Sequence, residues 1–123
     1  MQKLHIYLFL LLTFVTNLAI AQPPADKILV LGDSLSAGYG IDIQQGWVSL
    51  LQKELAKNHK VQVINASVSG ETSSGGKTRL PALLTEHKPD VVILELGGND
   101  GLRGQPLKLL EKNLQTMIDA SKN

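Results

Sequence analysis

Short apolar runs alternate with longer segments of helical periodicity along most of this chain. The apolar runs are rich in β-branched residues and bounded by Gly, Asn, Asp or Pro, which is typical of strands. They span Lys27–Leu31, Val61–Ile64 and Val91–Leu96. The first and third runs are almost continuously apolar, as expected for strands covered on both faces of a parallel sheet. The order βαβαβα predicts an α/β domain with right-handed crossovers.

Three segments outside these runs have the spacing of amphipathic helices. Trp47–Lys57 and Leu80–His87 each place apolar residues on one side, and a third helix starts near Pro106, because proline suits a first turn. Its apolar stripe comprises Leu107, Leu110, Leu114 and Ile118. If the strand order is 2-1-3, the loops after the first and third strands face each other where the winding reverses.

The N-terminus has the pattern of a secretory signal peptide. Lys3 precedes a nearly continuous apolar segment, Ile6–Val15, and Ala19 and Ala21 supply the small residues that a signal peptidase requires. The apolar segment is about half as long as the roughly 20 residues that span a bilayer, so a cleaved signal is favoured over a membrane anchor. We expect cleavage after Ala21, a mature domain over residues 22–123, and a periplasmic or secreted protein.

Charge and cysteine content exclude several classes of function. The 12 Lys and Arg residues nearly balance the 11 Asp and Glu residues, and neither sign forms a long block, so nothing indicates nucleic-acid binding. The absence of cysteine excludes a disulfide framework, a cysteine nucleophile and a cysteine-based zinc site.

Unusual residues cluster in the three segments that directly follow the expected strands: Gly32–Ser36, Asn65–Thr72 and Gly97–Gly101. Ligands of open parallel sheets bind beyond the carboxyl ends of the strands, so these segments should share one edge. Ser34 follows a buried strand and precedes a helical turn, where its hydroxyl can face a substrate carbonyl and the helix start favours negative charge. We therefore identify Ser34 as a candidate nucleophile.

Two further residues could complete such a site. Taken alone, Ser34 is typical of a helix cap, Gly70 of a turn, and the tract that contains Asn99 of a β-turn. Taken together, the backbone N–H groups of Ser34 and Gly70 and the side-chain amide of Asn99 can converge on a developing oxyanion. One such donor is worth on the order of 10²- to 10³-fold in rate. The combination indicates acyl-transfer chemistry.

Three sequence blocks carry a resemblance to a known family. G-D-S-L-S-A-G-Y-G, N-A-S-V-S-G-E-T-S and E-L-G-G-N-D-G-L-R-G resemble the first three blocks of the SGNH (GDSL) hydrolases, especially the bacterial thioesterase I, lysophospholipase and arylesterase group. The similarity extends from about Lys27 to the third helix. It implies a flavodoxin-like, doubly wound parallel sheet, Ser34 as nucleophile, and an oxyanion hole completed by Gly70 and Asn99.

That family also has an Asp-x-x-His pair near its C-terminus, with the histidine as general base. No aspartate here is followed three residues later by histidine, and no histidine follows His87. His59 and His87 fall near helix ends that lead into strands, at the edge opposite the reactive loops. We therefore expect residues 22–123 to be the N-terminal part of one hydrolase domain, with only the first three βα units and two more to follow. Such a part should be inactive and poorly stable by itself.

The resemblance implies an enzyme that cleaves ester or thioester bonds through an acyl-enzyme, with no metal ion or organic cofactor. Its substrates would be small aryl esters, acyl thioesters or lysophospholipids, and a carbohydrate acetylesterase is the alternative within the same chemistry. We expect no nucleic-acid partner, no stable membrane anchor after signal cleavage, and a monomer when the domain is complete.

Two other classes of function deserve comparison. The segment Gly75–Thr78 (GGKT) lies between a strand and a helix, as in a phosphate-binding P-loop, but Glu71 stands where that motif has its first glycine. A non-catalytic lipid- or carbohydrate-binding domain could also share this fold. Binding alone does not require a nucleophile together with every oxyanion donor, so the hydrolase is favoured.

Overall fold

The structure is a computed structural model that describes residues 25–123, so the expected signal peptide lies outside the described residues. In chain order the elements are β1 (Asp26–Gly32), α1 (Ser34–Ala37), the 3-10 helix η1 (Ile43–Gln45), α2 (Trp47–Leu55), β2 (Val61–Asn65), α3 (Ser73–His87), β3 (Val91–Glu95), α4 (Gly98–Leu102) and α5 (Leu107–Ser121). Within residues 25–123, none of the helices has the length and apolarity that a bilayer crossing requires.

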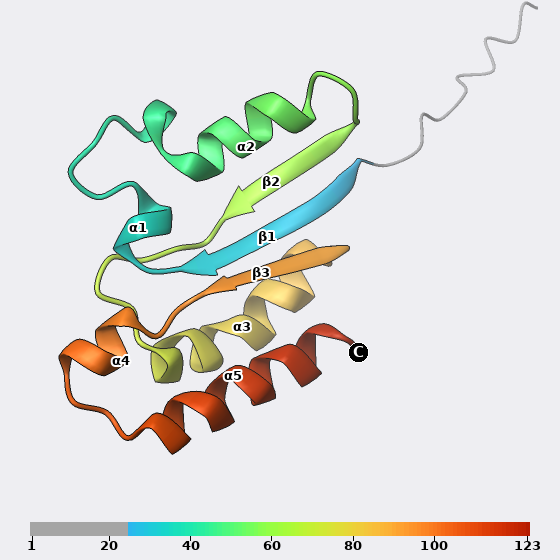
Figure 1. The fold of residues 1–123 in the computed structure, drawn as a ribbon. Helices are drawn as coiled ribbons and strands as arrows, with labels where there is room; N and C mark the ends of the chain where they lie inside the picture. The colour runs from blue at the N-terminus through green and yellow to red at the C-terminus, as the bar shows by residue number, and fades with distance from the viewer. Residues whose placement is uncertain (1–24) are drawn as a thin grey trace, which may run out of the picture.

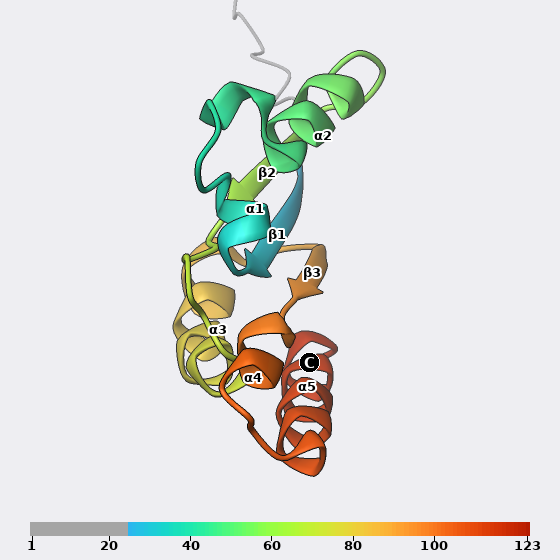
Figure 2. The ribbon, with the colours of Figure 1, turned by 60° about the vertical axis from the view of Figure 1, so that its left-hand side comes forward.

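The strands form one parallel sheet in the order β2-β1-β3, so the condition for the first and third loops to face each other is met. Helix α2 lies on one face of the sheet, and α3 and α5 lie side by side on the other (Figures 1 and 2). The central strand β1 is covered from both sides, and Leu29, Val30 and Leu31 have no exposed surface. The prediction of an α/β fold with a parallel sheet is therefore confirmed.

The main core lies between the sheet and the helices α3 and α5. Leu29 and Leu31 of β1 pack with Leu80 of α3 and Met117 of α5, all of them buried. Gly76 allows α3 to approach closely, because a Cβ atom there would lie 2.5 Å from the Leu96 Cδ1 atom. This packing holds the sheet against α3 and α5.

Two predicted elements differ from the observed ones. Helix α3 starts at Ser73 rather than near Leu80, because Thr72 Oγ1 caps it by accepting from the Gly75 amide at 3.3 Å. Its first turns bury small residues, so the apolar periodicity that marks a helix is absent there. Strand β3 was expected to be covered on both faces, but none of its residues is fully buried and Val91 is 49% exposed. Among the described strands it pairs only with β1.

The outer edge of β2 is occupied by a side chain. Gln52 of α2 donates from Nε2 to the Val61 carbonyl at 3.1 Å and accepts from the Val63 amide at its Oε1 at 2.7 Å. These are the backbone groups of β2 that point away from β1. The Gln52 amide therefore satisfies one donor and one acceptor that an edge strand would leave unpaired.

Candidate active site

The three segments singled out in the sequence meet at the carboxyl ends of the strands (Figure 1). Ser34 begins α1 directly after β1, Gly70 lies in the loop after β2, and Asn99 lies in α4 after β3. The Val68 amide donates to the Gly32 carbonyl at 3.0 Å, which ties the second loop to the end of β1. The predicted shared edge is thus present.

The side-chain amide of Asn99 links the loops that carry the other two candidate residues. Its Nδ2 atom donates to Asp33 Oδ2 at 3.2 Å and to the Glu71 carbonyl at 3.0 Å. Asp33 precedes Ser34 and Glu71 follows Gly70, so one amide bonds to the neighbours of both. An asparagine has two amide hydrogens, and donation to a ligand would therefore exchange one of these partners.

Ser34 sits in a tight turn whose first residue is nearly buried. Asp33 caps α1 by accepting from the Leu35 amide at its Oδ1 at 3.0 Å, and only 4% of Asp33 is exposed. Ser34 itself is partly exposed, as a nucleophile that meets a substrate must be. Helix α1 has only four residues, so its macrodipole is small and contributes less at Ser34 than the sequence suggested.

A chain of hydrogen bonds supports this turn, and sequence reasoning did not identify it. Trp47 Nε1 donates to Ser36 Oγ at 3.2 Å, and Ser36 Oγ donates to Glu95 Oε2 at 2.7 Å. The same carboxylate oxygen accepts from the Asp33 amide at 3.4 Å. The available signal was Glu95 itself, a single acidic residue within an otherwise apolar strand.

A second polar cluster, also missed, anchors α4. Asp100 is 1% exposed and accepts from the Ser73 amide at 2.8 Å and from Ser73 Oγ at 2.6 Å. Asn113 of α5 donates to the same Ser73 Oγ at 3.0 Å. The Asn-Asp-Gly tract, which alone suggested a β-turn, thus forms a short helix whose aspartate is fixed to α3.

Gly70 adopts a conformation that favours glycine. Its φ angle is +81°, in the left-handed region. Its carbonyl accepts from Arg103 Nη2 at 3.1 Å, which connects the loop after β2 with the end of α4. Arg103 is a further residue of this edge that sequence reasoning did not select.

The histidines lie where the sequence predicted, at the opposite edge of the sheet. His59 lines a hollow together with Asp26 and Asp90, at the amino ends of β1 and β3. The His87 carbonyl accepts from Lys27 Nζ at 3.1 Å, also at the start of β1. Within residues 25–123, no histidine is therefore placed near Ser34, and no group of three His, Cys, Asp or Glu side chains could hold a metal ion.

The Glu71 carboxylate lies against the first turn of α3, close to Gly75. It forms an ion pair with Arg79 at 2.9 Å, and the Glu71 side chain is 12% exposed. A Cβ atom at Gly75 would collide with Glu71 Oε1. A carboxylate this close to the first turn of α3 would repel a phosphate anion there, so the structure argues against the P-loop alternative.

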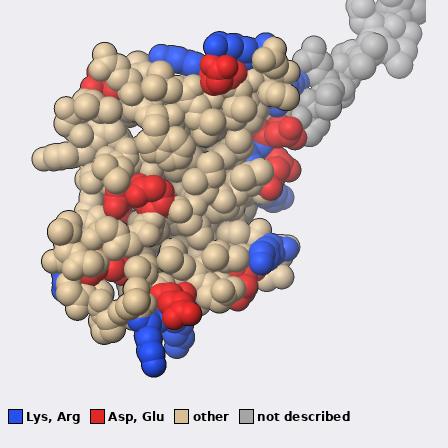
Figure 3. Space-filling model, in the orientation of Figure 1, with Lys and Arg blue, Asp and Glu red and all other residues tan. Residues whose placement is uncertain are grey.

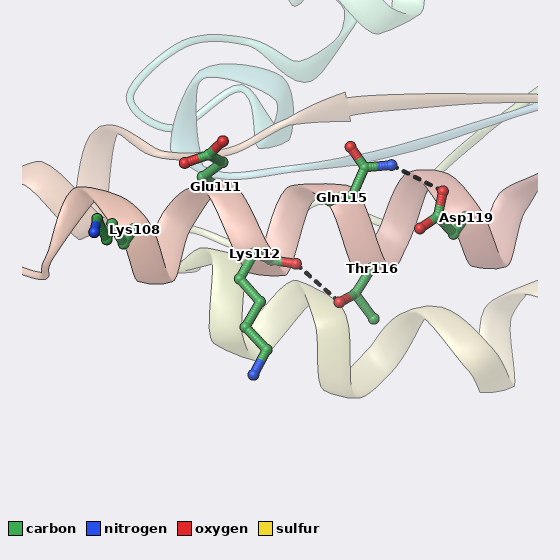
Figure 4. Close-up of a pocket in the computed structure, with 6 residues that line it drawn as sticks. All are labelled: Lys108, Glu111, Lys112, Gln115, Thr116 and Asp119. Atoms are coloured by element: carbon green, nitrogen blue, oxygen red, sulfur yellow. Dashed lines mark hydrogen bonds between the residues drawn. The ribbon is translucent and has the colours of Figure 1, made fainter.

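Other parts of the described surface also carry charged and polar side chains. The face shown in Figure 3 carries scattered basic and acidic side chains without a continuous basic patch. A shallow hollow of about 450 Å³ lies along α5, and residues of that helix alone line it (Figure 4). Its lining is polar: Lys108, Glu111, Lys112, Gln115, Thr116 and Asp119. Gln115 donates to Asp119 at 2.8 Å and Thr116 to the Lys112 carbonyl at 2.8 Å, so both groups are already paired on their own helix.

Comparisons with known proteins identify the family and the fold. The sequence model of the GDSL-like lipase/acylhydrolase family matches residues 30–123. The chain is 54% identical over 102 residues to esterase TesA of Pseudomonas aeruginosa, covering 82% of this chain and 51% of that protein. It is 47% identical over 110 residues to thioesterase 1/protease 1/lysophospholipase L1 of Escherichia coli K12, covering 89% of this chain and 50% of that protein.

A solved structure of the psychrotrophic esterase EstA from Pseudoalteromonas sp., inhibited by monoethylphosphonate, has a TM-score of 0.75 at 49% identity. The match covers 79% of this chain and 54% of that one. The chain thus spans about half the length of the relatives it matches.

Proposed function

This chain belongs to the GDSL-like lipase/acylhydrolase family, and on that premise we propose that Ser34 is the nucleophile of a carboxylic ester or thioester hydrolase. The observation that carries the proposal is the Asn99 amide, which bonds to the residue before Ser34 and to the residue after Gly70. These two bonds support a site in which the candidate nucleophile and the candidate oxyanion donors act together. Acyl transfer requires a nucleophile and hydrogen-bond donors that converge on the developing oxyanion.

The reaction has two halves. Ser34 Oγ attacks the carbonyl carbon while its proton passes to a general base, and the tetrahedral oxyanion accepts hydrogen bonds from the Ser34 and Gly70 amides and from Asn99. The oxyanion then collapses, the bond to the alcohol or thiol breaks, and the base returns the proton to that leaving group. Water next attacks the acyl-enzyme by the same route and releases the acid. We propose that the base is a histidine outside residues 25–123, because both described histidines lie at the opposite edge.

The proposed substrates are small aryl esters, acyl thioesters and lysophospholipids. Similarity to an esterase and to a thioesterase/lysophospholipase supports this class. A carbohydrate acetylesterase, which uses the same chemistry, is the alternative, and a panel of acyl-chain lengths and acetylated sugars separates the two. A non-catalytic binding domain is the alternative from another class.

Covalent labelling tests the proposal. The full-length gene product should react with a fluorophosphonate, because Ser34 Oγ forms a bond to phosphorus and displaces fluoride. Peptide mass spectrometry should find the adduct on Ser34, and Ser34→Ala should abolish it. Ser49→Ala, on α2, is the matched control and should label as the unchanged protein does. Absence of an adduct on Ser34 in a folded full-length protein would favour the non-catalytic alternative.

We also propose that the protein is exported by its N-terminal segment. The basic start, the apolar segment Ile6–Val15 and the small residues Ala19 and Ala21 support cleavage after Ala21. On expression with its own N-terminus, the exported product should begin at Gln22, as measured by intact mass. Ala21→Phe should block processing because the peptidase requires a small residue there. A product that keeps Met1 after export would contradict this proposal.

A further inference from the structure

We propose that Glu95 is a positioning residue that holds the turn carrying Ser34, an inference that rests on the proposed function of Ser34. Glu95 is the last residue of β3, and its side chain is only partly exposed. The carboxyl end of β3 lies beside the end of β1 in the sheet (Figure 1). Glu95 pairs in register with Gly32, the residue before Asp33. The Glu95 carboxylate therefore lies beside the start of the turn that carries Ser34.

One carboxylate oxygen of Glu95 holds both sides of Ser34. Glu95 Oε2 accepts from the Asp33 amide at 3.4 Å and from Ser36 Oγ at 2.7 Å. Asp33 precedes Ser34, and Ser36 follows it by two positions. Hydrogen bonds to a carboxylate are stronger than those between neutral groups, so this single oxygen restrains the turn at both ends.

Ser36 transmits this restraint because residues of two other elements hold it. It accepts from Trp47 Nε1 of the α2 helix at 3.2 Å, and its carbonyl accepts from Asn65 Nδ2 of β2 at 2.8 Å. Only 2% of Ser36 is exposed, so water has little access to replace a lost partner. A Cβ atom at Gly32 would lie 2.6 Å from Ser36 Oγ and 2.8 Å from Glu95 Oε2, so this close approach requires glycine.

The same carboxylate also connects the nucleophile with the candidate oxyanion donor. The chain runs from Glu95 through Gly97 directly into α4, which carries Asn99. Asn99 in turn donates to Asp33, the residue whose amide bonds to Glu95. A displacement of about 1 Å at a reacting group can lower the rate about 10²-fold. Loss of the Glu95 carboxylate should therefore act on the chemical step rather than on substrate binding.

Kinetics of the full-length protein test this inference. Glu95→Ala should lower kcat about 10²-fold with KM little changed, and should slow fluorophosphonate labelling of Ser34 to a similar degree. Glu95→Gln keeps an oxygen acceptor of the same reach and should recover most of the lost kcat. The control is Glu111→Ala, an exposed position on α5, which should leave kcat unchanged.

The outcomes separate this inference from the proposed function. If Ser34→Ala retains turnover, the proposed function fails, and the role of Glu95 fails with it. If Ser34→Ala is inactive but Glu95→Ala keeps its kcat, or Glu95→Gln is as impaired as Glu95→Ala, only the role of Glu95 is overturned. If Glu95→Ala does not fold, Ser36→Ala removes the Ser36 bond to Glu95 together with the bond from Trp47, and keeps the Asp33 bond. A reduced kcat at unchanged KM in Ser36→Ala then supports the inference, and an unchanged kcat refutes it.

Discussion

Replacing Ser34 with alanine in the full-length protein should lower kcat for a small aryl ester on the order of 10⁴-fold or more. The reason is chemical, because alanine offers no oxygen to form the acyl-enzyme and the remaining donors can only stabilise an uncatalysed attack by water. The fold should be unaffected, because Asp33 and Ser36 make the side-chain hydrogen bonds that hold the turn. Initial rates over a range of substrate concentrations measure the effect.

The control for Ser34→Ala is Ser49→Ala, which removes a hydroxyl from α2 and should keep normal turnover. Thermal unfolding of both variants should match that of the unchanged protein. Near-normal turnover by purified Ser34→Ala would remove Ser34 from the mechanism.

The second large effect is expected at Asn99. Asn99→Ala should lower kcat about 10²- to 10³-fold and change KM far less, because the amide is proposed to bind charge that exists mainly in the transition state. Asn99→Asp should be worse, because a carboxylate would oppose the developing oxyanion and would face Asp33 Oδ2, which lies 3.2 Å from the present amide nitrogen. Comparison of kcat and KM for the two variants measures both effects.

The hydrogen bonds of Asn99 add a change in stability to this prediction. Asn99→Ala removes two bonds, to Asp33 and to the Glu71 carbonyl, so the free energy of unfolding should fall by about 1 to 3 kcal/mol. Asn58→Ala, at an exposed position after α2, is the matched control and should change neither kcat nor stability. If both Asn99 variants changed only KM, Asn99 would be a residue that positions substrate or shapes the turn.

The strands and the shared edge could be predicted because they depend on local patterns. Apolar runs are visible in the sequence, and the carboxyl ends of parallel strands meet at one edge whatever the side chains are. These patterns do not determine the order of the strands, and the order 2-1-3 was only a condition until the structure showed it. The chemical roles of Ser34, Gly70 and Asn99 stay predictions, because position at the edge does not by itself demonstrate catalysis.

Long-range polar contacts could not be predicted in the same way. Glu95 and Ser36 are 59 residues apart, and Asp100 and Ser73 are 27 apart, so no local pattern relates them. Each bond depends on how β1, β3, α3 and α4 pack. The start of α3 was missed for a related reason, because its buried face is made by Ser73 and Gly76 rather than by leucines.

The side-chain amide of Gln52 favours one edge of the sheet over the other for the addition of a further strand. It occupies the Val61 carbonyl and the Val63 amide on the outer side of β2, so an approaching strand would first have to displace it. The edge of β3 has no neighbouring strand among residues 25–123. Any strand that joins this sheet, from the same polypeptide or from another molecule, should therefore add beside β3, and assembly or misassembly should proceed from that side alone.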